Sequence, residues 1–552
     1  MSHVVVIDLA NFVVDFTSKE ILNVKELKMF IKSYYQDFFP RLNLTYKNVL
    51  PSDEETCYKF MKAVIYRKQK FLDEYNILSQ EVKDDILYFI DSLYDYYRSL
   101  SRFIIFVNNQ ERQMSRRQMI NQFNALAKSV VSFYREIYET CLNSEQTVYR
   151  VLPSGANAGL LFSQNSLKLN DQLSFLDNIP LLEAVVTQPP FMVKTKQNKR
   201  VGTFFKQDHY VSEKDFDYKN AYGVLVKIFN TTGLVYFDKE YLGYLAAISN
   251  LFQIESYSKE KDVKIDFTVL FGTNNNENQC YYYELDDMLV GVMPKQANID
   301  YFGYVKKIML TLFNLKMIKQ KLLPIHGAGI KISSNGKTKN FVILGDSGAG
   351  KSETIEAIRH LYGSTYQIDT IFDDMGTFHI KDNKVYTTGT EIGAFVRLDD
   401  LDQGYSLRSM DRAVFFNIDQ VNSRVVIPIE TFAMTCDLHQ VDAFLLADNF
   451  SDSEEGIVYY KDSKTAKAEF VLGKRVALNT TQEKGLVSTY FANPFGPVQE
   501  KEFVETYLQS YFDTLFKNNV PVGKIYTRLS LDRKSGPYSG ARALIELFES
   551  LK

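Results

Sequence analysis

Apolar and polar positions follow two different patterns along the chain. From about Lys25 to Asn143 apolar residues recur at helical spacing and many of them are Tyr or Phe, as in the stretch 86–97. A second long helix is predicted from Met114 to Tyr138, because this stretch contains no Pro or Gly. From about Val201 onward, short apolar runs alternate with turns and helical segments, which is typical of an α/β protein. The pattern therefore predicts a mainly α-helical N-terminal region over residues 1–150, followed by α/β structure, with strands at 222–228 and 267–271.

One apolar run is followed at once by a glycine-rich loop and a helical pattern. The run 341–344 predicts a buried strand, and Ile355, Ile358 and Leu361 have the spacing of a helix. Between them lies a complete G-x-x-x-x-G-K-[ST] motif, formed by Gly345, Asp346, Ser347, Gly348, Ala349, Gly350, Lys351 and Ser352. In such a P-loop the backbone N–H groups and the helix N-terminus bind phosphate oxygens, the lysine reaches the β- and γ-phosphates, and the hydroxyl ligates Mg²⁺. A chance glycine turn is the alternative, and the flanking strand and helix disfavour it.

Composition narrows the class of protein without choosing a function. The chain has 552 residues, 45% of them hydrophobic, and a net charge of −3. It contains no run near the ~18 apolar residues of a membrane-spanning helix, and the apolar run Val4–Leu9 has no basic flank, so we expect a strand there and not a signal peptide. The charge gives no pull towards nucleic acid. Four well-separated cysteines favour neither zinc nor disulfides, so we expect a cytoplasmic protein.

Several short motifs surround the P-loop in a recognisable order. These are the segments 301–307 (YFGYVKK), 323–329 (LPIHGAG), Asp373-Asp374, 422–429 (NSRVVIPI), 483–485 (EKG) and 491–496 (FANPFG). Their order and spacing resemble the ATP-type phosphoenolpyruvate carboxykinases over roughly the second half of the chain. The P-loop itself, with Ser352-Glu353, is closer to that of the HPr kinase/phosphorylases, which share the same nucleotide-binding core.

The resemblance implies a fold and a set of roles. It implies a carboxykinase-like α/β substrate domain at 151–298 and a P-loop nucleotide- and metal-binding catalytic domain at 299–552. Beside ATP and Mg²⁺ it implies a second metal, Mn²⁺, held by Lys307, His326 and one of Asp373 and Asp374. It also places adenine near Lys484, Gly485 and Phe495, and it makes Arg424 the residue that bridges the transferred phosphoryl group, with Tyr301 and Arg397 beside the substrate.

Each of these roles has a structural alternative. His326 could be an ordinary core histidine, the Asp pair could form a turn, and Arg424 could be a surface charge. Lysine ligates a metal only as the neutral amine, so the metal role requires a strongly lowered pKa at Lys307.

The chain also departs from the carboxykinases. The family arginine that holds the oxaloacetate carboxylate has no counterpart: the segment 154–159 lacks Arg and Lys, and Arg200 is the only substitute. Ala394 takes the place of a family lysine, with Arg397 nearby.

Three functions follow from this evidence, in order of preference. The first is an ATP-dependent kinase with a small-molecule or protein acceptor; the second is a true phosphoenolpyruvate carboxykinase; the third is a non-catalytic ATP-binding sensor. The helical N-terminal region has no family counterpart and is a candidate protein-interaction or oligomerisation surface. Its basic cluster, Arg112, Arg116 and Arg117, is more simply explained as a solvated helix face.

Overall fold

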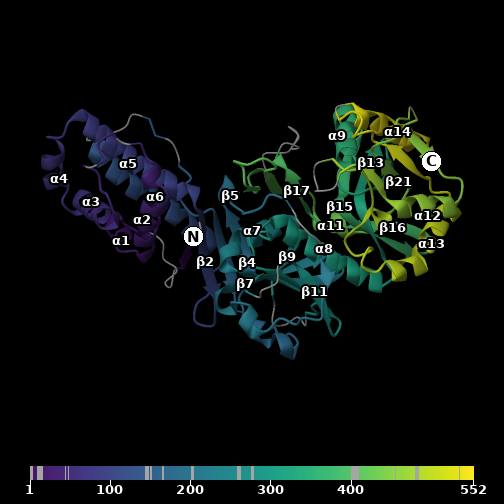
Figure 1. The fold of residues 1–552 in the computed structure, drawn as a ribbon, viewed down its shortest axis with the longest axis horizontal. Helices are drawn as coiled ribbons and strands as arrows, with labels where there is room; N and C mark the ends of the chain where they lie inside the picture. The colour runs from purple at the N-terminus through teal and green to yellow at the C-terminus, as the bar shows by residue number, and fades with distance from the viewer. Residues whose placement is uncertain are drawn as a thin grey trace. The chain divides into compact units, whose positions relative to one another are not determined.

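The chain is mixed α/β in the computed structural model (Figure 1). The structure describes residues 4–8, 16–43, 45–47, 49–142, 148–149, 152–164, 167–199, 204–257, 263–274, 279–398, 410–453, 455–478, 484–533 and 535–552. The chain divides into two compact units, one of residues 1–164 and 182–194, the other of residues 165–181 and 195–552. Each unit has its own core.

The first unit combines helices with parallel strands. Its helices are α1 (Ser18–Ile21), α2 (Lys25–Asp37), α3 (Glu54–Tyr66), α4 (Lys68–Tyr75), α5 (Gln80–Ser99) and α6 (Arg116–Leu142). The strands β1 (Val4–Asp8), β2 (Ser101–Asn108) and β3 (Ala158–Ser163) pair in parallel in that order. The helices bury an aromatic core in which Tyr34 and Phe89 have no exposed surface.

Two elements predicted for this unit are confirmed, and one segment differs. The long helix and the N-terminal strand are present, but residues 101–108 form β2 inside the stretch that we expected to be helical. Seven of its eight residues are buried. A strand covered on both faces shows a continuous apolar run without alternation, so its pattern does not separate it from a buried helix.

The second unit begins with a mixed sheet. Its strands run in the order β7 (Ala221–Ile228), β8 (Thr231–Asp238), β10 (Phe267–Thr273), β12 (Met288–Pro294), β11 (Tyr281–Leu285) and β6 (Phe205–Lys206), with β9 (Gln253–Glu255) beside β7. Both strands predicted from the apolar runs are present as β7 and β10. Helix α7 (Leu242–Leu251) and helix α8 (Phe302–Lys319) are almost completely buried, which agrees with apolar residues on all their faces.

A second sheet of eight strands carries the P-loop sequence. Its order is β20 (His439–Gln440), β16 (Lys384–Gly389), β15 (Gln367–Lys381), β13 (Leu323–Ser334), β14 (Lys337–Leu344), β21 (Ala443–Asp448), β25 (Val522–Tyr526) and β22 (Ile457–Tyr459). Helices α9 (Lys351–Tyr362) and α14 (Gly536–Ser550) share one apolar core with this sheet; α12 (Ser463–Leu472) and α13 (Lys501–Lys517) share another (Figure 1). The sheet therefore lies between two helical layers.

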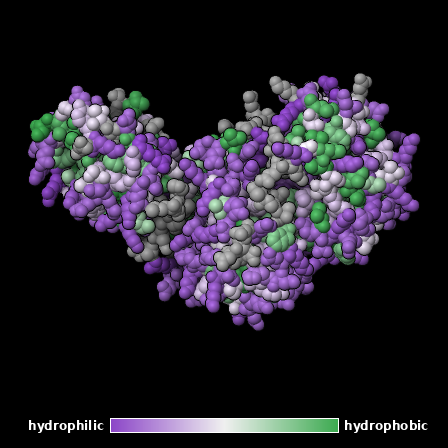
Figure 2. Space-filling model, viewed as in Figure 1, coloured by the Kyte–Doolittle hydropathy of each residue, from purple (hydrophilic) through white to green (hydrophobic). Residues whose placement is uncertain are grey.

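Smaller elements complete this unit. Strands β17 (Gly393–Arg397), β19 (Arg424–Pro428) and β18 (Val414–Phe416) pair antiparallel, as do β23 (Lys474–Val476) and β24 (Leu486–Ser488). A short helix, α11 (Phe432–Cys436), follows β19. Among the described residues no helix is long and apolar enough to cross a membrane. Figure 2 shows hydrophilic residues over most of the face in view.

Candidate active site

The glycine-rich segment forms a loop between a strand and a helix, as predicted. Strand β14 ends at Leu344 and α9 begins at Lys351. Gly348 and Gly350 have φ values of 80° and 90°, in the region that side chains disfavour. At Gly350 a Cβ atom would also lie 2.4 Å from Thr527 Oγ1, so both the backbone conformation and the close approach require glycine.

Three side chains donate hydrogen bonds to the carbonyl oxygens of the loop. Asn449 Nδ2 donates to Gly348 O at 2.8 Å, Thr527 Oγ1 donates to Ala349 O at 2.7 Å, and Thr354 Oγ1 donates to Gly350 O at 2.7 Å. A loop fixed in this way is preorganised, because its shape does not depend on a ligand.

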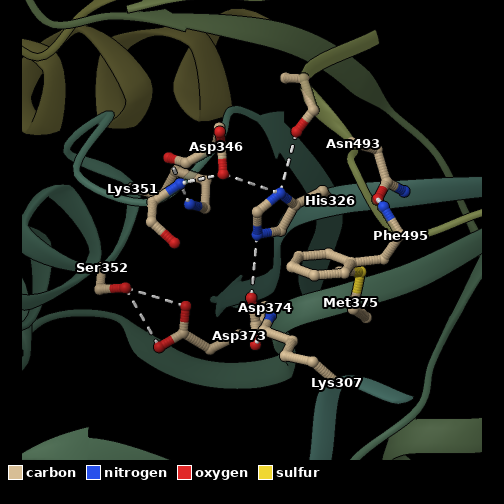
Figure 3. A network of polar contacts seen from close by, with 12 residues as sticks. Lys307, His326, Asp346, Lys351, Ser352, Asp373, Asp374, Met375, Asn493 and Phe495 are labelled. Atoms are coloured by element: carbon tan, nitrogen blue, oxygen red, sulfur yellow. Dashed lines mark hydrogen bonds and ion pairs between the residues drawn. The ribbon is translucent and has the colours of Figure 1, made fainter. Parts of the chain in front are cut away.

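Lys351 and Asp346 lie within this loop. The Lys351 side chain is buried and its Nζ donates to Asp346 O at 3.2 Å, so it curls back across its own loop (Figure 3). The Asp346 carboxylate accepts from the backbone N–H of Ser347 at 2.7 Å and forms an ion pair of 2.9 Å with Arg475. Burial by itself raises the pKa of Asp346, but His326 and Arg475 together hold it below its usual range.

The adjacent residues Asp373 and Asp374 on β15 serve two different groups of side chains (Figure 3). Ser352 Oγ donates to both carboxylate oxygens of Asp373, at 2.9 and 3.2 Å. Asp374 turns to the other group: its Oδ2 lies 2.6 Å from Lys307 Nζ and its Oδ1 lies 3.0 Å from His326 Nε2. Asp374 has a φ of 137°, so the strand is irregular where the two carboxylates separate. Of the two candidates for the second metal, the geometry therefore favours Asp374.

The ionisation of this cluster follows from its burial. Burial alone would raise the pKa of Asp374, but the charges of Lys306 and Lys307 and the contact with His326 hold it well below its usual range. Burial lowers the pKa of Lys307 to about 8, because the nearby Lys306 charge reinforces burial and Asp374 only partly offsets it. This is the direction that metal ligation by a lysine requires.

His326 faces oxygen atoms on both sides of its ring. Nδ1 is 2.9 Å from Ala492 O, and Nε2 is 3.0 Å from the Asp374 carboxylate. Burial lowers the pKa of this completely buried imidazole, which favours the neutral form. A neutral imidazole carries one proton, so in either tautomer one ring lone pair faces an oxygen lone pair. A cation between Nε2 and Asp374, with Nδ1–H donating to Ala492 O, would remove this conflict, so the donor set fits a metal ion.

Two residues of this cluster were not predicted from the sequence. Lys306 is buried and bridges Asp374 Oδ2, at 2.7 Å, and Glu391 Oε1, at 2.9 Å. Burial raises the pKa of Glu391 to about 7, although Lys306 opposes the shift. Among the described residues no three His, Cys, Asp and Glu side chains gather as a metal-ligand group, because the cluster around His326 and Asp374 is completed by lysines.

The predicted substrate residues lie together on the small sheet and at the start of α8. Arg397 and Arg424 are directly opposite each other on the antiparallel strands β17 and β19. The Arg424 guanidinium lies 5.8 Å from the Phe395 ring, and Tyr301 packs on the same ring with a centroid distance of 5.8 Å. Like charges at directly opposite positions repel each other, so an anion bound between the arginines would stabilise this arrangement.

The residues predicted to surround adenine separate into two places. Lys484 and Gly485 are exposed and immediately precede β24. The paired strand β23 reaches the P-loop, because Arg475 contacts Asp346 and Asn449 bridges Gly348 O and Val476 O. Phe495, in contrast, is 4% exposed and packs on Lys307 and His326, at 4.4 Å from Nζ and 5.6 Å between ring centroids. We therefore assign it to the lysine–histidine cluster instead of an adenine pocket.

Two residues named from the sequence, Arg200 and Glu483, lie outside the described residues. The segment 154–159 belongs to the first unit, where Arg102 Nε donates to Gly155 O at 2.9 Å. No protein-family model and no curated protein sequence matches this chain.

Proposed function

We propose that this chain is an ATP-dependent phosphotransferase, with a P-loop core of the carboxykinase type and a small-molecule or protein acceptor. The observation that carries the proposal is that Asp373 and Asp374 contact different side chains. One carboxylate lies at the hydroxyl of the P-loop serine, where Mg²⁺ bound to ATP is held in P-loop proteins. The other lies between Lys307 and His326. Two cation positions on neighbouring residues suit the charge of a transferred phosphoryl group.

The chain's own residues supply the remaining requirements of phosphoryl transfer. The loop amides and Lys351 would bind the phosphates, and Ser352 and Asp373 would hold Mg²⁺. Lys307, His326 and Asp374 would hold Mn²⁺, which adds positive charge beside the acceptor when it is bound. Because catalysis of phosphoryl transfer consists mainly of positioning and charge neutralisation, no further nucleophile from the protein is needed.

The acceptor is best sought among anions. Arg424 and Arg397 face each other across two strands, and the planar guanidinium binds carboxylate and phosphate through paired hydrogen bonds. The second candidate function is a true carboxykinase that converts oxaloacetate and ATP to phosphoenolpyruvate, CO2 and ADP. The lowered pKa of Lys307 favours it, because a neutral lysine is a metal ligand in that family.

ATP binding is tested by calorimetry with Mg²⁺ on the wild type, on Lys351→Ala and on Lys381→Ala, in which an exposed lysine is removed. Loss of a charge-assisted contact predicts a roughly ten- to hundredfold weaker ATP affinity for Lys351→Ala only. No binding of ATP to the wild type would refute the proposal.

The reaction is tested by following ADP formation with oxaloacetate and with a panel of carboxylates and hydroxy acids. Robust phosphoenolpyruvate formation would put the carboxykinase first. ATP binding without turnover on any acceptor would favour a non-catalytic sensor. His326→Ala should abolish stimulation by Mn²⁺ and leave ATP binding intact, because His326 lies outside the P-loop.

A further inference from the structure

The helical part of the first unit contains a cavity that has no part in the proposed function. Its volume is about 160 Å³. One wall consists of buried side chains from α3, α5 and α6, including Met61, Leu93 and Phe133. The opposite wall consists of half-buried side chains from α1 and α2, including Ile21, Leu27 and Phe30. The cavity is therefore a local gap between helices that contact each other elsewhere, as Phe30 of α2 and Tyr97 of α5 do with a ring centroid distance of 5.8 Å.

The size and lining of the cavity suit a small ring. A cavity of about 150 Å³ lined by apolar side chains stays dry and binds benzene. Aromatic side chains contribute to both walls here, with Phe30 from α2 on one side and Phe60, Tyr94 and Phe133 from α3, α5 and α6 on the other. Such side chains favour another ring through edge-to-face contacts.

The hydroxyl of Tyr97 is a polar group among the lining residues. The Tyr97 hydroxyl is buried and makes no hydrogen bond of ordinary geometry to any residue that the structure describes, although the Arg102 guanidinium is a charged neighbour. The hydroxyl of Tyr134, which also lines the cavity, donates to Asp91 at 2.6 Å and is satisfied. The Tyr97 ring is fixed in place: the Arg102 guanidinium lies over it at 4.7 Å and donates to the carbonyls of Tyr97, Leu100 and Gly155. A buried hydroxyl without a partner costs free energy that a ligand can recover.

The charge of the lining narrows the ligand further. Glu26 is the one ionisable carboxylate among the lining residues, and it disfavours an anion. A cation would lose its hydration among apolar walls. We infer that this cavity binds a small, neutral aromatic molecule with one hydroxyl group, whose ring lies among the apolar side chains and whose hydroxyl pairs with Tyr97.

The inference is tested with three probes of similar size: phenol, toluene and benzoate. Calorimetry on the full chain should show saturable binding of phenol, weaker binding of toluene and none of benzoate. Tyr97→Phe keeps the ring and removes the hydroxyl, so it should reduce the affinity for phenol to that for toluene, a loss of roughly two- to tenfold. An unchanged ratio of the two affinities would overturn the assignment of Tyr97.

The location is tested by filling the cavity. Val130→Phe places a ring into it from α6, whereas Ile120→Phe adds the same ring at a position of α6 that is 43% exposed. Only Val130→Phe should abolish phenol binding; retained binding, or no saturable binding to the wild type, would overturn the inference. If Val130→Phe does not fold, the phenol and toluene affinities of Tyr97→Phe decide. Lys351→Ala should bind phenol as the wild type does, which keeps this test separate from the nucleotide site.

Discussion

Replacement by asparagine should have different consequences at Asp373 and Asp374. Asp374 is 19% exposed and pairs with Lys306 at 2.7 Å, Lys307 at 2.6 Å and His326 at 3.0 Å. Asp374→Asn removes the charge and leaves two largely buried ammonium groups without it. Asparagine is the suitable replacement, because it has the shape of aspartate and removes only the charge.

The expected loss of stability in Asp374→Asn follows from the burial of the ion pairs that Asp374 forms with Lys306 and Lys307. Removing one partner of a buried ion pair costs about 3–5 kcal/mol, because the other charge stays uncompensated. Glu391 remains as a partner for Lys306, and Lys307, whose pKa of about 8 includes the opposing effect of Asp374, should lose its proton more readily in the variant, so the cost should decrease as the pH rises. Asp373 is half-buried and accepts from one hydroxyl, so Asp373→Asn should cost only about 0.5–1.5 kcal/mol.

Native-state hydrogen exchange followed by mass spectrometry measures this difference locally. Peptides from β13 and β15 should lose roughly two to four decades of protection in Asp374→Asn at pH 7, and one decade or less in Asp373→Asn. The Mg²⁺-dependent part of ATP affinity should instead fall in Asp373→Asn. Equal losses of protection in the two variants would refute the reasoning, since they would show that the Asp374 charge is not held by the lysines.

Three further predictions concern other parts of the second unit. Gly350→Ala should abolish ATP binding and lower the melting temperature by several degrees, because its Cβ would lie 2.4 Å from Thr527 Oγ1; Gly336→Ala, with φ of 79° and nothing within 4 Å, controls for the backbone conformation alone. The folded-state pKa of Lys307, about 8, lies below its ordinary value of 10.5. Between these pH values the folded state binds fewer protons than the unfolded state. The free energy of unfolding should therefore rise with pH across this window, by up to about 3 kcal/mol. Urea unfolding from pH 8 to 10.5 should lose this contribution in Lys307→Met, and an unchanged slope would contradict the assignment. Arg424→Gln should abolish turnover and leave ATP binding intact, because Arg424 lies on β19 and not in the P-loop, and its charge would be needed only at the transferred phosphoryl group; a variant that keeps its turnover would contradict this role.

The parts of the fold that the sequence predicted are those with a local signal. The strand, loop and helix around Gly345–Ser352 follow one another within about twenty residues, and each has its own periodicity. The helix predicted at 114–138 is observed at 116–142. Strand β2 was missed because seven of its eight residues are buried, on both faces, and show no alternation.

Which side chains contact one another in the site could be learned only from the structure. Adjacent residues of a regular strand point to opposite faces of the sheet. The sequence does not show which of these faces Lys307 lies on, so it left open whether Asp373 or Asp374 contacts Lys307. The irregular backbone at Asp374 has no sequence signal. Glu391 and Arg475 were missed for a related reason: each reaches the site from a distant segment, and a single charged residue in sequence is normally a solvated one.

The Asp374 cluster is better explained by function than by stability. Lys306, Lys307, Asp374 and Glu391 all lose hydration where they lie, and burial opposes the charged form of each. Apolar side chains of similar volume commonly serve a core as well as a buried ion pair does, or better. A cluster kept only for stability would moreover need no histidine whose lone pair faces an oxygen. The arrangement becomes favourable if a cation occupies it, because a divalent charge would satisfy the imidazole and the carboxylate and would displace the proton that Lys307 already holds weakly. The unfavourable features of the cluster are thus the features that a metal-assisted phosphoryl transfer would use.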